Sequence, residues 1–419
     1  GHNGAAARQP GPGGPAVVGP ALTFHCRPPD PAAGTAEESR LELHVANPYG
    51  FRLVAQPITS GVPFHQGELA DAANARLLDP SGQEVPLQAD AGTHWPDGSI
   101  KWLFVSFLTD AEPHATVTHT LEYGTAVRRS APAGALTCRA EGDTLSVDTG
   151  ALQVAFDKTR SGFPTSIRSA RAPAGQPPLV GPRMAAEVTD CQGNQFTTLH
   201  PPERIELEEA GPVRAVVLVA GHHRGPDGQT LFAYRNRFVF YAGLSRMALS
   251  YTWLNDVDAS HFAEFDAIRL HVPVPAGEAQ AWTAGLGDGQ QAQGHGSWSL
   301  TQLRDDAYQV TPAAPEGTTA RRADGWLDLA GPGGGLTAVV RDFWQLYPKA
   351  LHVTGDGLTI DLCPDFAPGT YDDCTKLDEI KLYYYLMGGK YKVACGLQKQ
   401  HELLLSFRAG DDPVRAAEV

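Results

Sequence analysis

One pair of neighbouring segments constrains the fold more than any other part of the chain. In residues 232–241, aromatic side chains and Asn236 occupy every second position, and Arg235 and Arg237 lie between them. After a turn at residues 242–244, the same period continues through Met247, Leu249, Tyr251 and Trp253. Successive side chains of a strand point to opposite faces, so a period of two predicts a β-hairpin and excludes a helix.

Further segments of strand composition follow the same reasoning. They are residues 213–220, 268–272, 327–340 with an internal Gly-rich turn, 382–387 and 403–407. Gly and Pro number 45 and 33 among 419 residues, and such frequent breakers favour short strands and many turns. We predict an all-β protein whose larger part is an antiparallel β-sandwich.

Changes in composition divide the chain. Residues 1–20 are mostly Gly, Ala and Pro and carry too little apolar surface to order themselves, so a tail or linker is predicted. A first β-domain is expected over residues 21–134, because a Pro-containing, polar linker follows Tyr123. The sandwich is expected over residues 135–410, and residues 411–419 begin a linker or a further domain. Two domains also agree with a length beyond the usual single-core limit.

The net charge of −14 argues against nucleic acid and against an anionic membrane surface as partners, since both reward clustered Lys and Arg. No apolar run approaches the roughly 18 residues that a membrane span needs. A polyanionic substrate would therefore require basic residues gathered locally in a cleft.

Six cysteines are present, without a CxxC motif or a Cys/His cluster, so no structural zinc site is predicted. Cys363 and Cys374 flank a turn-rich loop that a disulfide could close, and we predict this bridge; buried thiols are the alternative. No cofactor is predicted. Acidic residues between Asp365 and Glu379 leave Ca²⁺ as an alternative, although their spacing fits no EF-hand loop.

A Trp-Pro-Asp-Gly-Ser turn at residues 95–99 precedes a strongly apolar run. Asp97-Gly98 favours a tight turn, and the following residues have strand composition on both faces, with Trp102 and Phe104 on one and Leu103 on the other. We predict a core strand with Trp102 buried. Trp95, beside the turn, is a candidate for stacking on a sugar, with a purely structural role as the alternative.

The whole segment 51–107 resembles the N-terminal RIFT-barrel domain of the exo-rhamnogalacturonan lyase family, polysaccharide lyase family 26 and its relatives. YRNRFVFYAG from Tyr234, AVVRDFWQLYPKAL from Ala338 and GLQKQHELLLSF from Gly396 resemble segments of the central β-sandwich domain of the same family, in the same order. The resemblance implies a RIFT-type β-barrel before the sandwich, a secreted or periplasmic location, and β-elimination on an acidic plant-type polysaccharide such as rhamnogalacturonan.

That family normally continues into an α/α-toroid domain after a K-x-H-E segment, matched here by Lys399, His401 and Glu402. A C-terminal toroid or self-association is therefore the expected partner arrangement. The alternative function is a non-catalytic carbohydrate-binding or assembly module.

Elimination from a uronate needs a cation at the carboxylate, a base for the C5 proton and an acid for the leaving oxygen. His222, His223 and Arg224 lie in a GHHRGPDG turn that follows a predicted strand, and the next strand carries three further candidates, Tyr234, Arg235 and Arg237. If these strands form a hairpin, the two groups are neighbours; the alternative is a solvated hairpin with surface His and Arg.

Lys399 and His401 form a second candidate group, because residues two apart on a strand share a face. A structural role at the join to the next domain is the alternative. We assign His401, Lys399, Tyr234 and Arg235 as catalytic candidates. The substrate-binding candidates are His222, His223, Arg224, Arg237 and Trp95. The tyrosines at 383–385 are of a type that supplies an acid or a stacking surface, with core packing as the alternative.

Motifs of other enzyme classes are missing from the sequence: it has no GxSxG elbow, HExxH helix, P-loop or dinucleotide fingerprint. A glycoside hydrolase with paired carboxylates stays open as an alternative, because the spatial separation of Asp and Glu side chains cannot be read from a sequence.

Overall fold

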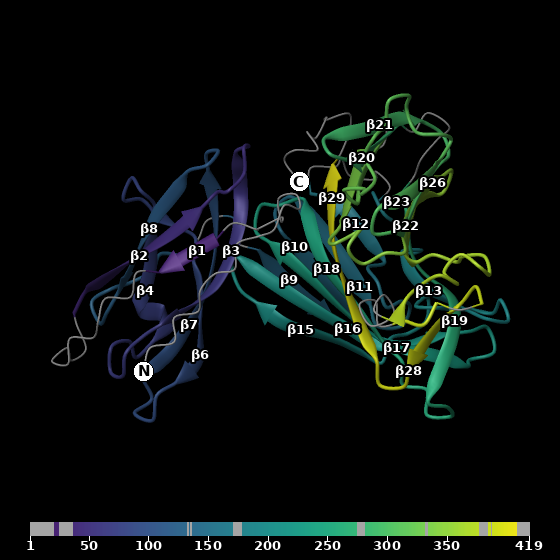
Figure 1. Ribbon diagram of the computed structural model, residues 1–419. Helices are drawn as coiled ribbons and strands as arrows, with labels where there is room; N and C mark the ends of the chain where they lie inside the picture. Colours follow the sequence, from purple (N-terminus) through teal and green to yellow (C-terminus); the bar gives the residue numbers. More distant parts are fainter. Residues whose placement is uncertain are drawn as a thin grey trace, which may run out of the picture. The chain divides into compact units, whose positions relative to one another are not determined.

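The structure is a computed structural model, and it describes residues 21–24, 37–131, 134, 136–170, 178–274, 281–331, 334–376, 384–386 and 388–408. The chain divides into two compact units, Gly1–Ala131 and Pro132–Val419. Figure 1 shows both units built from strands. The predicted all-β class is confirmed, since strands dominate the described residues of each unit.

The first unit holds two antiparallel sheets around one core. One sheet has the order β1-β2-β8-β4-β5 and the other β3-β7-β6. Their inward side chains, which include Leu43, Val62, Leu103 and Phe107, form a continuous apolar cluster. The elements are β1 (Ala21–Phe24), β2 (Ser39–Ala46), β3 (Leu53–Pro63), the 3₁₀ turn η1 (Ala72–Asn74), β4 (Ala75–Leu78), β5 (Glu84–Val85), β6 (Gln88–His94), β7 (Ile100–Ala111) and β8 (Thr116–Tyr123).

Strand β7 is apolar on both faces but buried on one only. Leu103, Val105 and Phe107 point into the core as predicted, whereas Trp102 and Phe104 are 40% and 52% exposed. The prediction that Trp102 is a core residue is therefore wrong. An apolar run on two faces indicates burial on both only when a second layer covers the outer face.

The second unit begins with a four-stranded antiparallel sheet of order β12-β11-β10-β9. Its strands are β9 (Thr137–Glu141), β10 (Thr144–Asp148), β11 (Leu152–Asp157) and β12 (Ser166–Ser169). Phe156 of this sheet contacts Phe238 and Phe240 of the main sheet, at ring-centroid distances of 5.1 and 6.4 Å. The small sheet thus covers one end of the main hydrophobic core.

The other seventeen strands of the described residues form one antiparallel hydrogen-bonded network. They are β13 (Ala185–Asp190), β14 (Gln195–Thr197), β15 (Arg204–Ala210), β16 (Arg214–Arg224), β17 (Thr230–Tyr241), β18 (Arg246–Leu254), β19 (Phe262–Pro273), β20 (Ala281–Gly287), β21 (Gln290–His295), β22 (Trp298–Arg304), β23 (Ala307–Thr311), β24 (Trp326–Gly331), β25 (Gly334–Val340), β26 (Lys349–Thr354), β27 (Gly357–Cys363), β28 (Tyr391–Ala394) and β29 (Gln398–Arg408).

Strand pairing follows two long runs. One run passes through β15, β16, β17, β18, β29, β25, β24, β20 and β21, and the other through β14, β13, β19, β27, β26, β22 and β23. Side chains from both runs meet in the same buried cluster, as expected of a sandwich.

The predicted hairpin is present as β17 and β18. All five alternate residues from Phe232 to Phe240 are buried, while Arg235 and Arg237 lie on the other face. Gly243 has a φ of 74°, a left-handed conformation that suits the turn between the strands. Strands are also present at the other predicted positions except 382–387, where Tyr385 forms only an isolated bridge with Lys392 and residues 382, 383 and 387 lie outside the described part of the chain.

The predicted Cys363–Cys374 disulfide is wrong, because both residues occur as thiols. Cys363 ends β27 inside the core, where its Sγ lies 3.3 Å from the hydroxyl of Tyr384. Hydrogen bonds fix the turn instead: the amide of Cys374 donates to the carbonyl of Tyr371, and the Tyr371 hydroxyl donates to the carbonyl of Leu303.

Among the described helical segments, there is none with the length and apolar character that crossing a membrane would require.

Candidate functional site

The structure separates the predicted site residues onto two faces of one sheet. In β17, Tyr234 is buried in the sandwich while Arg235 is exposed on the outside. His222 and His223 lie within β16 and not in the predicted turn, and the alternation of side chains along this strand buries His223 and leaves His222 half-exposed. The two groups are neighbours along the hairpin, as predicted, but they do not share one surface.

The interior face carries a cluster of three basic side chains, Lys349 of β26 with Lys399 and His401 of β29, which we call the interior basic cluster. Lys399 and His401 share a face of β29, as predicted. The Nζ atom of Lys349 lies 3.2 Å from Nδ1 of His401 and 3.3 Å from the carbonyl oxygen of Leu362. Lys349 is 0% and His401 1% exposed.

The electrostatics of this cluster are unusual. Burial, together with the charge of Lys399, lowers the pKa of Lys349 to about 7. Burial lowers the pKa of Lys399 to about 8, and the pKa of His401 falls well below its ordinary value because of burial and the two lysines. Among the described residues, neither Lys349 nor His401 has a carboxylate at ion-pairing distance, and the attraction of Cys363 and Asp342 for the Lys349 ammonium is smaller than the effect of its burial.

Aromatic rings surround the cluster. The ammonium of Lys399 lies 4.0 Å from the ring centroid of Tyr384, which stacks on Trp253 with an interplanar angle of 9°. Burial raises the pKa of the Tyr384 hydroxyl well above its ordinary value, so this group stays protonated. Unlike its buried neighbours Lys349 and His401, Lys399 keeps part of its side chain accessible to solvent.

His223 and Tyr234, two other candidates, also face the interior. The ring of His223 bonds through Nδ1 to the carbonyl of Phe232 and through Nε2 to the hydroxyl of Tyr251, each at 2.8 Å. Burial lowers the pKa of His223 to about 4 and raises the pKa of Tyr234. Both are fixed in the core beside the interior basic cluster, because Tyr251 pairs with His401 between β18 and β29.

His222 has a different environment on the outer face. Its Nδ1 lies 2.7 Å from Glu203 and its Nε2 2.7 Å from Asp256, and Arg224 approaches Glu203 at 3.5 Å. Burial lowers the pKa of His222, but the hydrogen bonds to the two carboxylates outweigh it, so the pKa is raised overall. An imidazole held between two carboxylates is already satisfied and does not need a substrate carboxylate.

We therefore expect an NMR titration to place the pKa of His222 above its ordinary value, with Glu203→Gln lowering it. Because the folded-state pKa is raised, the stabilisation by protonated His222 is present at low pH and is lost as pH rises through that pKa. Glu206→Gln, at a carboxylate paired with Arg204, is the control. An unchanged His222 titration in Glu203→Gln would show that the ion pair does not hold the proton.

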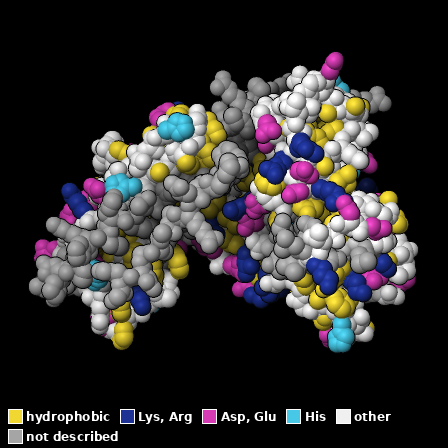
Figure 2. Space-filling model, viewed as in Figure 1, with side chains coloured by type: hydrophobic (Ala, Val, Ile, Leu, Met, Phe, Trp, Pro, Cys, Tyr) yellow, Lys and Arg dark blue, Asp and Glu magenta, His cyan; other side chains and the backbone are white. Residues whose placement is uncertain are grey.

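Two of the three candidate arginines on the outer face, Arg224 and Arg237, have carboxylate partners, whereas Arg235 is exposed. Arg237 makes two hydrogen bonds to Glu208, at 2.6 and 2.9 Å. Figure 2 shows Lys and Arg side chains interspersed with Asp and Glu over the visible face of the sandwich. The interior basic cluster is thus a better candidate for anion recognition than this face.

Trp95, the last predicted binding residue, is part of the fold of the first unit. Its indole N–H donates to the carbonyl of Phe64 at 3.0 Å, and the ammonium of Lys101 lies 4.5 Å from the ring centroid. One face of the ring is therefore already covered. The structural alternative for Trp95 is the better description.

Sequence reasoning missed Lys349 altogether. The signal that could have indicated it is a single lysine within an apolar run, Tyr347 to Leu351, where a strand has no polar face for it. It also missed the exposure of Trp102 and Phe104. The signal that could have indicated it is the pair Gly61 and Gly92 on the neighbouring strands, because residues without a side chain leave room for the two rings on the surface of the sheet.

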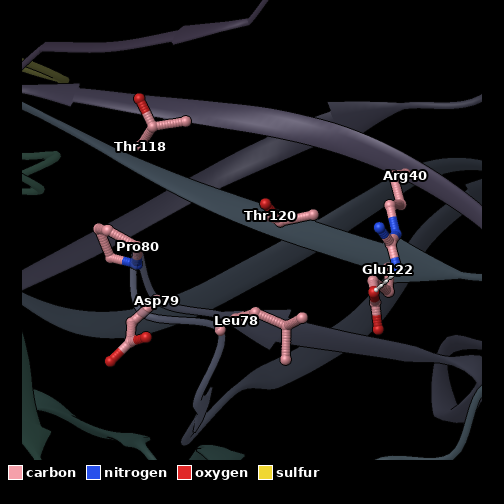
Figure 3. A pocket seen from close by; sticks show the side chains of 8 residues that line it. Arg40, Leu78, Asp79, Pro80, Thr118, Thr120 and Glu122 are labelled. Atoms are coloured by element: carbon pink, nitrogen blue, oxygen red, sulfur yellow. Dashed lines mark ion pairs between the residues drawn. The ribbon is translucent and has the colours of Figure 1, made fainter.

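Two surface depressions are polar. One of about 500 Å³ lies on the outer face of β2, β8 and β4, where Arg40 and Glu122 form an ion pair of 2.8 Å and the threonines of β8 lie alongside (Figure 3). The other, of about 260 Å³, has Arg341 paired with Glu402 at 2.6 Å. In both, these charged groups already have partners within the chain.

The alternative of a Ca²⁺ site finds no support among the residues that the structure describes, where no group of three or more His, Cys, Asp or Glu side chains could hold a metal ion. Residues 377–379 of the acidic loop lie outside the described part.

Fold and site together define a two-unit all-β protein whose antiparallel sandwich contains a basic interior. The chain matches the PcRGLX-like N-terminal RIFT barrel domain over residues 51–122 and the PcRGLX-like protein central beta sandwich domain over residues 136–282 and 278–360. These matches cover more than half of its length, so the chain belongs to the PcRGLX-like family. The predicted family and the predicted RIFT-type barrel followed by a sandwich are both confirmed.

The individual proteins that resemble this chain share little sequence with it. The chain is 29% identical over 221 residues to the uncharacterized protein YetA of Bacillus subtilis (strain 168), a stretch that covers 51% of this chain and 24% of that protein. The chain thus matches about a quarter of the length of this curated relative. An α-mannosidase from Enterococcus faecalis V583 is similar in structure, with a TM-score of 0.50 and 13% identity, over 88% of this chain and 43% of that chain. This likeness concerns the fold alone.

Proposed function

We propose that the protein acts on an acidic plant-type polysaccharide such as rhamnogalacturonan by β-elimination, as a polysaccharide lyase. Family membership supports the substrate class, and the interior basic cluster is the observation that carries the proposal. Its chemistry fits the need for a cation and a base at one place. Such a substrate is extracellular, so the proposal includes a secreted or periplasmic location.

Lys399 is the residue of the cluster that a substrate would reach, since it keeps partial exposure. With a pKa of about 8, both its protonated and its neutral form are populated near neutral pH. In its neutral form the amine is a base for the C5 proton, and the ammonium that results then lies beside the uronate carboxylate. Tyr384, beneath the ammonium, stays protonated but is as buried as His401, so it supports the position of Lys399 and does not itself reach the leaving oxygen.

His401 has another role in this proposal. It lies too deep to touch a polysaccharide, and its Nδ1 instead accepts a hydrogen bond from Lys349. We assign it as a positioning residue that orients Lys349 behind Lys399. Tyr234 and His223 support the same interior from the neighbouring strands. A C-terminal α/α-toroid or a second copy would complete a cleft over Lys399.

The test follows the ultraviolet absorbance of the unsaturated uronate when the natural full-length protein is mixed with rhamnogalacturonan. Lys399→Met is expected to lower turnover by about 10²-fold. Lys392→Met is the matched control, because its ammonium also lies over a ring, 4.9 Å from the Phe262 centroid, on another part of the sandwich. Equal activity of wild type and Lys399→Met would remove Lys399 from the reaction.

The second candidate function is a non-catalytic carbohydrate-binding or assembly module. The burial of His401, His223 and Tyr234 favours it, because catalytic groups must reach a substrate. If rhamnogalacturonan is bound but no absorbance develops, this second function replaces the first.

A further inference from the structure

The outer face of the sheet β3-β7-β6 in the first unit carries two exposed aromatic rings that the proposed reaction does not use. Trp102 and Phe104 are two residues apart on β7, so their side chains leave the same face about 7 Å apart. We call them the aromatic platform. Large apolar side chains are normally buried, and a pair of them exposed side by side is typical of a binding surface.

Two glycines let these rings lie flat. A Cβ atom built on Gly61 of β3 would lie 3.2 Å from Cε3 of Trp102 and 3.4 Å from Cε1 of Phe104. On the other side, a Cβ atom on Gly92 of β6 would lie within 3.0 Å of the opposite edge of the Phe104 ring. The Phe104 ring therefore spans from β3 to β6 across the sheet, with one face against the backbone and the other toward solvent.

Hydrogen-bonding side chains border the platform. Thr59 is exposed and its hydroxyl lies 3.0 Å from that of Ser106, two residues along β7 from Phe104. On β6, Asp90 pairs with Phe104 and Thr93 pairs with Trp102, and both are exposed. Flat rings bordered by hydroxyl and carboxylate oxygens suit a ligand that is apolar on one face and rich in hydroxyl groups at its edge.

A pyranose ring has this character, because its C–H groups form an apolar face and its hydroxyls project from the rim. The C–H groups of such a face carry the partial positive charge that the face of an aromatic ring attracts. The carboxylate of Asp90 beside Phe104 repels a uronate and accepts hydrogen bonds from neutral hydroxyls. The border thus favours a neutral sugar over an acidic one.

We propose that Trp102 and Phe104 form a second carbohydrate-binding surface, distinct from the interior basic cluster, which stacks on neutral pyranose residues of a polysaccharide. The ligand class rests on the function proposed above, while the location rests on the rings, glycines and polar border alone. Such a surface would hold a polysaccharide through its neutral part while elimination acts on its uronates.

The test is affinity electrophoresis of the full chain in gels that contain a neutral galactan or a polygalacturonate. We expect the galactan to retard the wild type, and the double variant Trp102→Ala/Phe104→Ala to bind at least about tenfold more weakly. Gly92→Ala keeps both rings but lifts Phe104 from the sheet, and it should also weaken binding. Phe51→Ala is the matched control, since Phe51 is 43% exposed in the same unit and stacks on Tyr49.

Equal retardation of wild type and double variant would overturn the proposal, as would retardation by polygalacturonate only. Light scattering supplies a further check: a wild-type dimer that the double variant dissociates, without a difference in galactan binding, would identify a second copy as the occupant and also overturn it. Lys399→Met is expected to bind galactan like the wild type. Loss of elimination activity and loss of galactan binding can therefore be distinguished.

Discussion

Lys349→Met is expected to raise the free energy of unfolding at pH 7 by about 3 kcal/mol. Lys349 is fully buried, and among the residues that the structure describes its ammonium has the Leu362 carbonyl and the His401 ring as hydrogen-bond partners. The shift of its pKa from 10.5 to about 7 corresponds to a cost of about 5 kcal/mol at neutral pH. Methionine has a similar length, fills the same space without a charge and gives up only the two hydrogen bonds.

The effect should depend on pH in a defined direction. Because the pKa of Lys349 is lower in the folded state, the unfolded chain binds more protons between about pH 7 and pH 10.5, and wild-type stability rises with pH over this interval. The methionine variant lacks this contribution. Its advantage is therefore largest at or below pH 7 and shrinks toward zero near pH 9.

Urea unfolding at pH 7 and pH 9 measures both quantities. Only the difference between variant and wild type is used, so contributions of other titrating groups, such as Lys399 and the buried tyrosines, largely cancel. Lys392→Met again serves as the control, with little change expected at either pH. A Lys349→Met variant that is less stable than the wild type at pH 7 would show that the ammonium is stabilised by a partner outside the described residues.

The sequence was sufficient to predict the strands of the sandwich, because alternation is a local property. Phe232 and Arg235 lie on opposite faces for the same reason that they alternate in the chain. The faces of β7 could not be assigned in this way. Both are apolar, and which one is covered depends on where the other sheet of the unit lies, which no local pattern records.

The candidate site shows the same limit. Lys399 and His401 could be placed on one face from their spacing alone. Their partners could not, since Trp253 and Tyr251 meet them through the pairing of β18 with β29, and Lys349 reaches His401 across 52 positions of sequence. His222 and His223 are adjacent in sequence and were predicted as one group, yet strand alternation sends them to opposite faces.

The Cys363–Cys374 bridge was predicted from a loop that could bring its ends together. The turn does form, but aromatic packing and hydrogen bonds determine where the thiols lie. Tyr371 packs against Phe366 with ring centroids 4.8 Å apart, and Cys363 points to Tyr384 in the core. A loop composition indicates a turn; it does not fix the direction of the side chains at its ends.

His401→Ala is expected to lower the free energy of unfolding by about 3 kcal/mol, in addition to any loss of activity. The substitution leaves a cavity in a closed part of the core and removes an acceptor from the buried ammonium of Lys349. The control is His271→Ala, at a partly exposed imidazole that bonds Thr359 at 3.2 Å on the outer face, where less than about 1 kcal/mol is expected.

The double variant Lys349→Met/His401→Leu distinguishes positioning from simple packing. If His401 serves to hold Lys349, His401→Leu should cost less stability in the Lys349→Met background than in the wild type, because no buried ammonium is then left without its acceptor. Activity should remain low in the double variant. Equal costs of His401→Leu in the two backgrounds would contradict the coupling, and full activity in the double variant would show that neither residue prepares Lys399 for the reaction.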